Sequence, residues 1–214
     1  MKLEFAAELI QRGYDRDLGN MLANAPLDKN GVEAYLLTDG TLVIPGTNDT
    51  KDWRRNLTTG AHMRGASRRT WHKGFLEHAR VVFAYAAPLK PKRVIGHSLG
   101  AAASQIIAVS LRIPAICFAS PRPLRGSQHF VGEDKILNIN RYGDDLRRRC
   151  RRAFGFAMWV ASIGSAPVRS NPKAAIVSPT ICVRCLVVVR DHRSRIAGLT
   201  KRGSPPAGRP PFLN

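Results

Sequence analysis

The chain has 214 residues, of which 44% are hydrophobic and 23% charged, a composition typical of one soluble globular domain. This excludes a wholly disordered chain, a collagen-like repeat and a small disulfide scaffold, and no apolar run has the length of a transmembrane helix. The net charge of +19 is uneven: residues 1–145 carry 20 basic and 14 acidic side chains, whereas residues 146–214 carry 14 basic and one acidic. The excess therefore belongs to the tail.

Predicted helices and strands alternate along the first two thirds of the chain. Apolar residues at helical spacing predict helices over Leu3–Arg12, residues 74–88 and Leu99–Leu111. Short apolar and β-branched runs predict strands over Val32–Thr38, Thr41–Pro45, Arg93–Gly96, Ala115–Ala119 and Lys135–Ile139. The first two strands are expected to form a hairpin around Asp39-Gly40. This alternation predicts an α/β domain with a mostly parallel central sheet flanked by helices.

The most informative motif is a G-x-S-x-G sequence, Gly96-His97-Ser98-Leu99-Gly100, between a predicted strand and a predicted helix. In such a motif the serine sits on a strained turn, and side chains at the two glycine positions would collide with the neighbouring strand and helix. The turn exposes the serine oxygen and points the next amide toward a developing oxyanion. The motif over residues 94–101 therefore predicts a nucleophile elbow, with a chance match in a glycine-rich loop as the alternative.

Five segments, in order from about residue 30 to residue 146, together resemble the class 3 lipases, the fungal-type triacylglycerol lipases and their bacterial or phage relatives. The segments are Ile44–Thr47 with Asp52-Trp53 and Asn56-Leu57, His72–Phe75, the elbow, Phe118–Arg122, and Asn138–Asn140 with Asp144–Leu146. Pro45 stands where the family usually has arginine. The resemblance implies an α/β-hydrolase fold and a serine hydrolase mechanism without metal or organic cofactor.

The resemblance implies a role for several residues. Ser98 would be the nucleophile, and the backbone amides of Leu99 and Thr47 would be the two oxyanion donors. The acid that orients the catalytic histidine would be Asp145 or, as the alternative, Asp144. Asp144 fits the family motif as it stands, whereas counting back from a Pro-Pro segment hidden in a shifted reading frame favours Asp145. A solvated acidic turn is the other interpretation of this pair.

The general base has a single candidate in the expected chain order, because His192 is the only histidine after the acid. The family often presents its histidine in an Asp-His context near the C-terminus, as in Asp191-His192. A surface histidine in a basic tail is the competing interpretation. His97, within the elbow, is expected to pack or to form hydrogen bonds. Of the remaining histidines, His72 belongs to a structural segment, and surface positions are predicted for His62, His78 and His129.

The tail departs from the family pattern after Leu146. It holds 12 Arg against 2 Lys, no Tyr, and three of the four Cys. This suggests a G+C-rich gene read out of frame from about residue 147 to a point before Asp191. A one-base shift across Met158-Trp159 gives Val-Gly preceded by His, Asn, Asp or Tyr, and across Arg149–Arg152 it permits Pro-Pro. The expected organisation is a core over 1–146, an atypical Arg-rich remainder over 147–202, and a disordered end over 203–214.

The predicted function is carboxylic ester hydrolysis through an acyl-enzyme on Ser98. The segment Asn48–Leu57 lies near the position of the lid in fungal relatives and is mostly polar, which favours short-chain or soluble esters over a lipid interface. The alternatives are a catalytically inactive lipase-like protein and a basic binder of nucleic acid or anionic membrane through residues 147–202.

The remaining expectations concern partners and location. An ester substrate is expected, with no specific nucleic acid and at most peripheral membrane contact, and the sequence leaves the oligomeric state open. The lone Cys182–Cys185 pair is weak evidence for a metal site. Glu4 and Glu8 interrupt the apolar N-terminal stretch, which lacks the uncharged core of an export signal and so predicts a cytoplasmic protein, with export by a signal-less route as the alternative.

Overall fold

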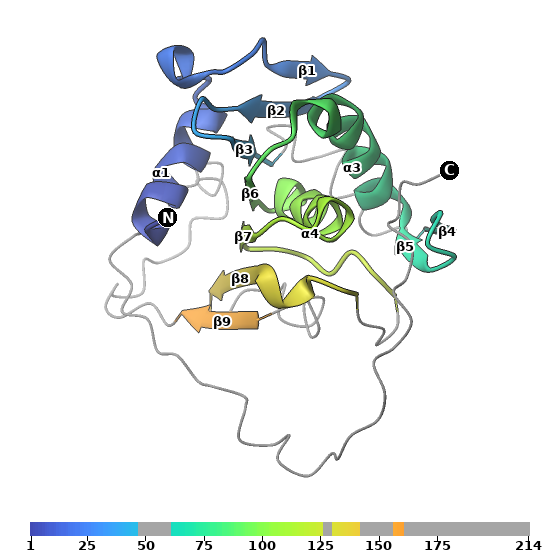
Figure 1. The fold of residues 1–214 in the computed structure, drawn as a ribbon. Coiled ribbons are helices and arrows are strands. Elements are labelled where there is room, and N and C mark those ends of the chain that lie inside the picture. Colours follow the sequence, from blue (N-terminus) through green and yellow to red (C-terminus); the bar gives the residue numbers. More distant parts are fainter. Residues whose placement is uncertain (47–60, 126–129, 142–155, 161–214) are drawn as a thin grey trace, which may run out of the picture.

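The computed structural model describes residues 1–46, 61–125, 130–141 and 156–160. Within these ranges a seven-stranded sheet has the order β1-β2-β3-β6-β7-β8-β9 (Figure 1). The parallel strands are β3 (Thr41–Ile44), β6 (Arg93–His97), β7 (Ala115–Phe118), β8 (Ile136–Arg141) and β9 (Phe156–Val160). The antiparallel strands β1 (Leu27–Lys29) and β2 (Val32–Leu36) extend one edge. A separate hairpin pairs β4 (His62–Arg64) with β5 (Thr70–His72).

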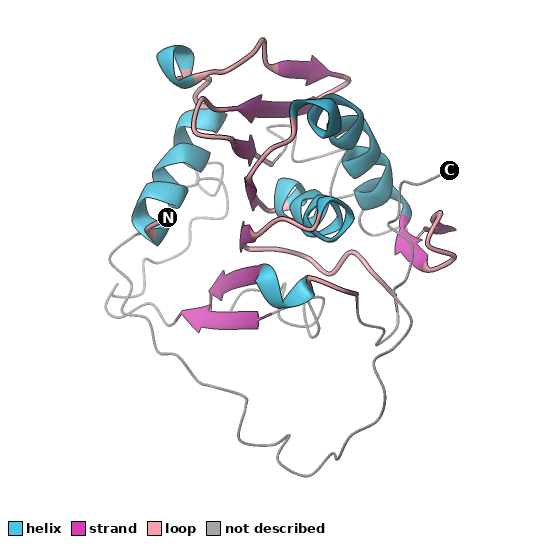
Figure 2. Cartoon of the chain, viewed as in Figure 1, coloured by secondary structure: helices cyan, strands magenta, loops and turns pink. Residues whose placement is uncertain are grey.

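Helices cover both faces of the sheet. Helix α1 (Leu3–Tyr14) packs on one face, whereas α3 (Lys73–Ala86) and α4 (Leu99–Leu111) pack on the other (Figure 2). The described residues also form the short 3-10 turns η1 (Gly19–Met21), η2 (Ala87–Leu89) and η3 (Glu133–Lys135). In the described part of the chain, no helix has both the length and the apolar character needed to cross a membrane.

Alternation along the strands divides the apolar core into two layers. In β3, Leu42 and Ile44 join the cluster under α3 and α4, whereas Val43 joins the cluster under α1. In β6, Val94 and Ile95 divide in the same way. Because successive strand residues point to opposite faces, a sheet covered on both sides needs apolar residues at consecutive positions. This explains why these strands read as continuous apolar runs.

The predicted α/β class is confirmed as a mixed, mostly parallel sheet flanked by helices. The predicted hairpin is also confirmed, with Leu36 paired to Leu42 and the Gly40 amide bonded to the Leu37 carbonyl. Four three- to five-residue strands were not predicted, namely β1, β4, β5 and β9. The first three are short and largely polar, so they lack the apolar alternation on which strand prediction depends.

The surface position predicted for His78 is wrong. Its side chain lies on the inward face of α3, in register with the buried residues Phe75, Ala79 and Val82. The helical spacing of these residues places position 78 on the same stripe. His62, by contrast, is exposed as predicted, and His129 lies outside the described residues.

Candidate active site

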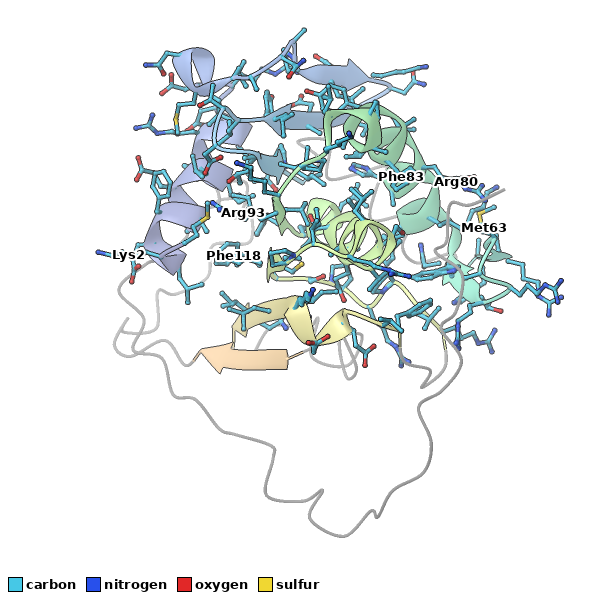
Figure 3. The ribbon with its side chains drawn as sticks, viewed as in Figure 1. Lys2, Met63, Arg80, Phe83, Arg93 and Phe118 are labelled. Carbon is cyan, nitrogen blue, oxygen red and sulfur yellow. The ribbon has the colours of Figure 1, made fainter. Side chains whose placement is uncertain are left out.

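Ser98 occupies the turn between β6 and α4, at the carboxyl end of a central strand of the sheet. Its backbone has φ +53° and ψ −117°, a conformation that residues with a side chain rarely adopt. The Ser98 amide donates to the Phe118 carbonyl at 2.9 Å, and the Ser98 carbonyl accepts the Ala102 amide at 3.1 Å. Phe118 ends β7 on the side of α1 (Figure 3). The strained turn is therefore held by the neighbouring strand and by the first turn of α4.

The two glycines of the motif are required by close packing, as the sequence predicts. A β-carbon at Gly96 would overlap Ser104 Oγ and lie 2.6 Å from the Gly100 carbonyl oxygen. A β-carbon at Gly100 would overlap the carbonyl oxygens of Ile44 and Pro45. The first clash involves α4 and the second involves the end of β3. The backbones of strand, turn and helix thus approach each other as closely as glycine permits.

Tyr14, the last residue of α1, joins two segments of the site through one phenolic oxygen. The Gly46 amide donates to Tyr14 Oη at 2.7 Å, and the same oxygen lies 2.7 Å from His97 Nδ1. Because the amide can only donate, the phenol proton is assigned to the bond with His97. The imidazole then accepts at Nδ1 and carries its own proton at Nε2. The two rings meet edge to face with centroids 5.7 Å apart.

Burial fixes the protonation of this pair at neutral pH. It raises the pKa of Tyr14 to about 12 and lowers the pKa of His97 to about 4. The phenol is therefore a donor and the imidazole a neutral acceptor, which agrees with the direction of their hydrogen bond. A histidine with these properties is a poor general base near pH 7. His97 thus has the hydrogen-bonding role expected from its place in the motif.

The chain leaving β3 passes directly beside the elbow. A β-carbon built on Gly46 would lie 3.3 Å from Ser98 Cβ and 3.3 Å from the His97 carbonyl oxygen. Gly46 therefore contacts the backbone that carries the serine. The next residue is Thr47, the expected second oxyanion donor, which lies outside the described residues.

A buried glutamine ties α4 to the segment that follows β7. Gln105 Nε2 donates to Ser120 Oγ, and to the Pro121 carbonyl at 3.3 Å. Gln105 and Ser120 are both fully buried. Ser120 and Pro121 belong to the Phe118–Arg122 segment of the resemblance. This bond therefore fixes a loop at the same end of the sheet as Ser98.

Two of these residues were missed by sequence reasoning. Gln105 had a detectable signal, because it is a large polar residue inside a helix of otherwise small and apolar side chains. Tyr14 had none, since 83 residues separate it from His97 and no local pattern links them.

The structure places the elbow residues together but does not cover the rest of the predicted site. One turn contains Gly96, His97, Ser98, Leu99 and Gly100. The described residues do not include the expected acid at Asp145 or Asp144, the expected base His192, or the Cys182–Cys185 pair. They also do not include the predicted lid segment or, apart from β9, the predicted tail regions. Among described residues, no group of three or more His, Cys, Asp or Glu side chains is arranged to hold a metal ion.

Comparison with known proteins gives no family assignment. No family model matches the chain, and no curated protein matches it.

Proposed function

We propose that the protein is a serine carboxylic ester hydrolase of the α/β-hydrolase fold, related to the class 3 lipases. The observation that carries the proposal is the backbone of Ser98, with its positive φ at a strand-to-helix turn. A residue in such a conformation costs about 1–3 kcal/mol, and such strain is concentrated at functional sites. The glycines packed on both sides and the Gly46 chain beside Ser98 support the same interpretation.

The proposed reaction has two half-reactions. In the first, Ser98 Oγ attacks the ester carbonyl and forms an acyl bond while its proton passes through a histidine to the departing alcohol. In the second, water attacks the acyl carbon and gives a proton to the histidine, which passes it to Ser98 Oγ as the acyl–oxygen bond breaks and the acid is released. The Leu99 amide, in the first turn of α4, is free of an intrahelical acceptor and is proposed as one oxyanion donor.

The remaining roles follow from the resemblance. The Thr47 amide is the proposed second oxyanion donor, His192 the base, and Asp145 or Asp144 the residue that orients it. Short-chain, water-soluble esters are the proposed substrates, because the sequence of the segment Asn48–Leu57 is mostly polar and so has few apolar side chains for binding a lipid interface.

The test is hydrolysis of a short-chain p-nitrophenyl ester by the full chain beside Ser98→Ala. Ser110→Ala is the matched control, since Ser110 lies in the same helix and donates to the Ile106 carbonyl at 2.6 Å, away from the elbow. Wild type and control are expected to be active and Ser98→Ala inactive. A fluorophosphonate probe should label Ser98 in a peptide map. Activity that survives Ser98→Ala overturns the proposal, and a wild type that neither hydrolyses esters nor reacts with the probe indicates a catalytically inactive relative.

A further inference from the structure

We infer that Tyr14 is a positioning residue for ester hydrolysis, which fixes the distance between the chain that enters the oxyanion site and the chain that carries the nucleophile. This inference rests on the proposed function. It assigns a positioning role to α1, whose last residue lies 83 positions before His97 in the sequence. The argument uses the place where the sheet ends, the two bonds of one phenol, and the rigidity of its helix.

The regular sheet ends just before the site. The pairing of β3 with β6 runs from Thr41 with Arg93 to Ile44 with Gly96. Gly46 lies two residues beyond the last paired residue of β3, and His97 lies one residue beyond its partner. Both therefore extend past the ladder that holds the two strands together. Tyr14 Oη bonds to each at 2.7 Å, and so continues the connection where backbone pairing has stopped.

The bond to Gly46 also determines which amide can reach a substrate. A backbone amide has a single proton, and that of Gly46 is directed to Tyr14 Oη. It is therefore not available to an oxyanion. The proposed donor from this segment is therefore a later amide, and Gly46 is the last described residue before it. An error of a fraction of an ångström at such a donor is costly, because oxyanion stabilisation depends on preorganised geometry.

The phenol is held firmly enough to act as a positioning group. Tyr14 packs against the apolar cluster under α1, and its ring contacts His97 edge to face. The preceding residue, Gly13, approaches β3 so closely that a β-carbon there would lie 3.3 Å from Val43 Cγ1. The C-terminal turn of α1 is closed by the Asp15 amide bonded to the Gln11 carbonyl at 3.0 Å. The position of Tyr14 Oη is therefore set by the docking of α1 on the sheet.

The test compares Tyr14→Phe with Tyr35→Phe in the full chain. Both changes remove only a hydroxyl from a tyrosine in or against the α1 cluster, but Tyr35 donates to Glu33 at 2.9 Å and not to the site. For Tyr14→Phe we expect kcat on a p-nitrophenyl ester to fall about tenfold or more, as for a disturbed oxyanion site, with KM nearly unchanged. Tyr35→Phe should keep the wild-type kcat. The two variants should melt at similar temperatures.

Substitutions at His97 test the same bond from its other end. The Oδ1 atom of asparagine can accept the Tyr14 proton much as imidazole Nδ1 does, whereas leucine cannot accept it. His97→Asn is therefore expected to lose less kcat than His97→Leu. A second readout needs no turnover: in nitrogen NMR spectra, His97 should be the neutral tautomer with its proton on Nε2, and Tyr14→Phe should raise its pKa.

The outcomes separate the inference from the proposed function. A Tyr14→Phe protein with wild-type kcat overturns the positioning role, while the proposed ester hydrolysis stands. A loss of kcat matched by an equal loss in Tyr35→Phe reduces Tyr14 to a stabilising residue. A wild type without esterase activity or probe labelling overturns the proposed function, and the positioning role with it.

Discussion

Gly100 packs so closely against Ile44 that a β-carbon at position 100 would overlap the Ile44 carbonyl oxygen. The contact joins the first turn of α4 to the end of β3, through two residues that are 56 positions apart in the chain. The β-carbon would meet a backbone oxygen, so no side-chain rotation relieves the overlap. The elbow is therefore constrained by the positions of the strand and helix backbones.

The first prediction concerns this contact. Gly100→Ala should lower the free energy of unfolding by about 3 kcal/mol or more, because overpacking against backbone forces the helix and strand apart. Gly19→Ala is the control, since a β-carbon at Gly19 meets no atom within 4 Å, and it should change stability by less than about 0.5 kcal/mol. Urea unfolding followed by circular dichroism measures both. Equal stability of the two variants would contradict the packing argument.

The glycine spacing of the elbow illustrates what local sequence can predict. Periodicity and turn residues correctly predict α4 over Leu99–Leu111 and the hairpin at Asp39-Gly40, because these elements depend on neighbouring residues. They fail for β1, β4 and β5, whose pairing depends on partners and not on their own apolar pattern.

The candidate site divides in the same way. The Gly96–Gly100 turn is encoded in five consecutive residues, and its place between a strand and a helix is predicted from sequence. Tyr14 is brought to His97 only by the docking of α1 on the sheet. The sequence around Tyr14 does not distinguish it from any other tyrosine at the end of a helix. Helical spacing predicts the burial of His78, because it shares a stripe with other buried residues of α3. The surface prediction is wrong because it treats an isolated histidine as an exposed residue.

A second prediction uses the strain at Ser98. Glycine adopts positive φ without the penalty that a β-carbon brings, so Ser98→Gly should be more stable than Ser98→Ala by about 1 kcal/mol. At Ser110, inside α4, the order should reverse, since glycine in a helix costs about 1 kcal/mol relative to alanine. Thermal unfolding of the four variants gives the comparison. If the alanine variant is more stable than the glycine variant at position 98 as well as at position 110, Ser98 is not strained.

A third prediction concerns Gln105. Gln105→Ala removes the amide that donates to Ser120 and Pro121 and leaves a cavity in the core, so we expect a loss of about 2–4 kcal/mol in unfolding free energy. Gln11→Ala breaks a solvent-exposed bond to Asp15 and should cost under about 0.5 kcal/mol. Denaturant titration measures the unfolding free energy of both variants. A Gln105→Ala protein as stable as Gln11→Ala would mean that the buried bond contributes nothing net.

The last prediction is a dependence of stability on pH. Burial lowers the pKa of His78 from 6.5 to about 4, and its buried Nε2 atom has no hydrogen-bond partner among the residues that the structure describes. Between these two values the unfolded chain binds a proton that the folded chain does not. Folding stability is therefore highest above about pH 6.5 and falls as the pH is lowered toward 4. Burial also lowers the pKa of His97, which adds a loss of the same sign.

His78→Leu should remove the share of this loss that comes from position 78. Leucine has a similar volume, does not bind a proton, and leaves no polar atom unpaired among Phe75, Ala79 and Val82. We expect the melting temperature of the variant to exceed that of wild type by more at pH 5 than at pH 8. The exposed His62 is the control, and His62→Leu should follow the wild-type pH curve. If wild type and His78→Leu lose stability in parallel from pH 8 to pH 5, His78 is not the group that takes up the proton on unfolding.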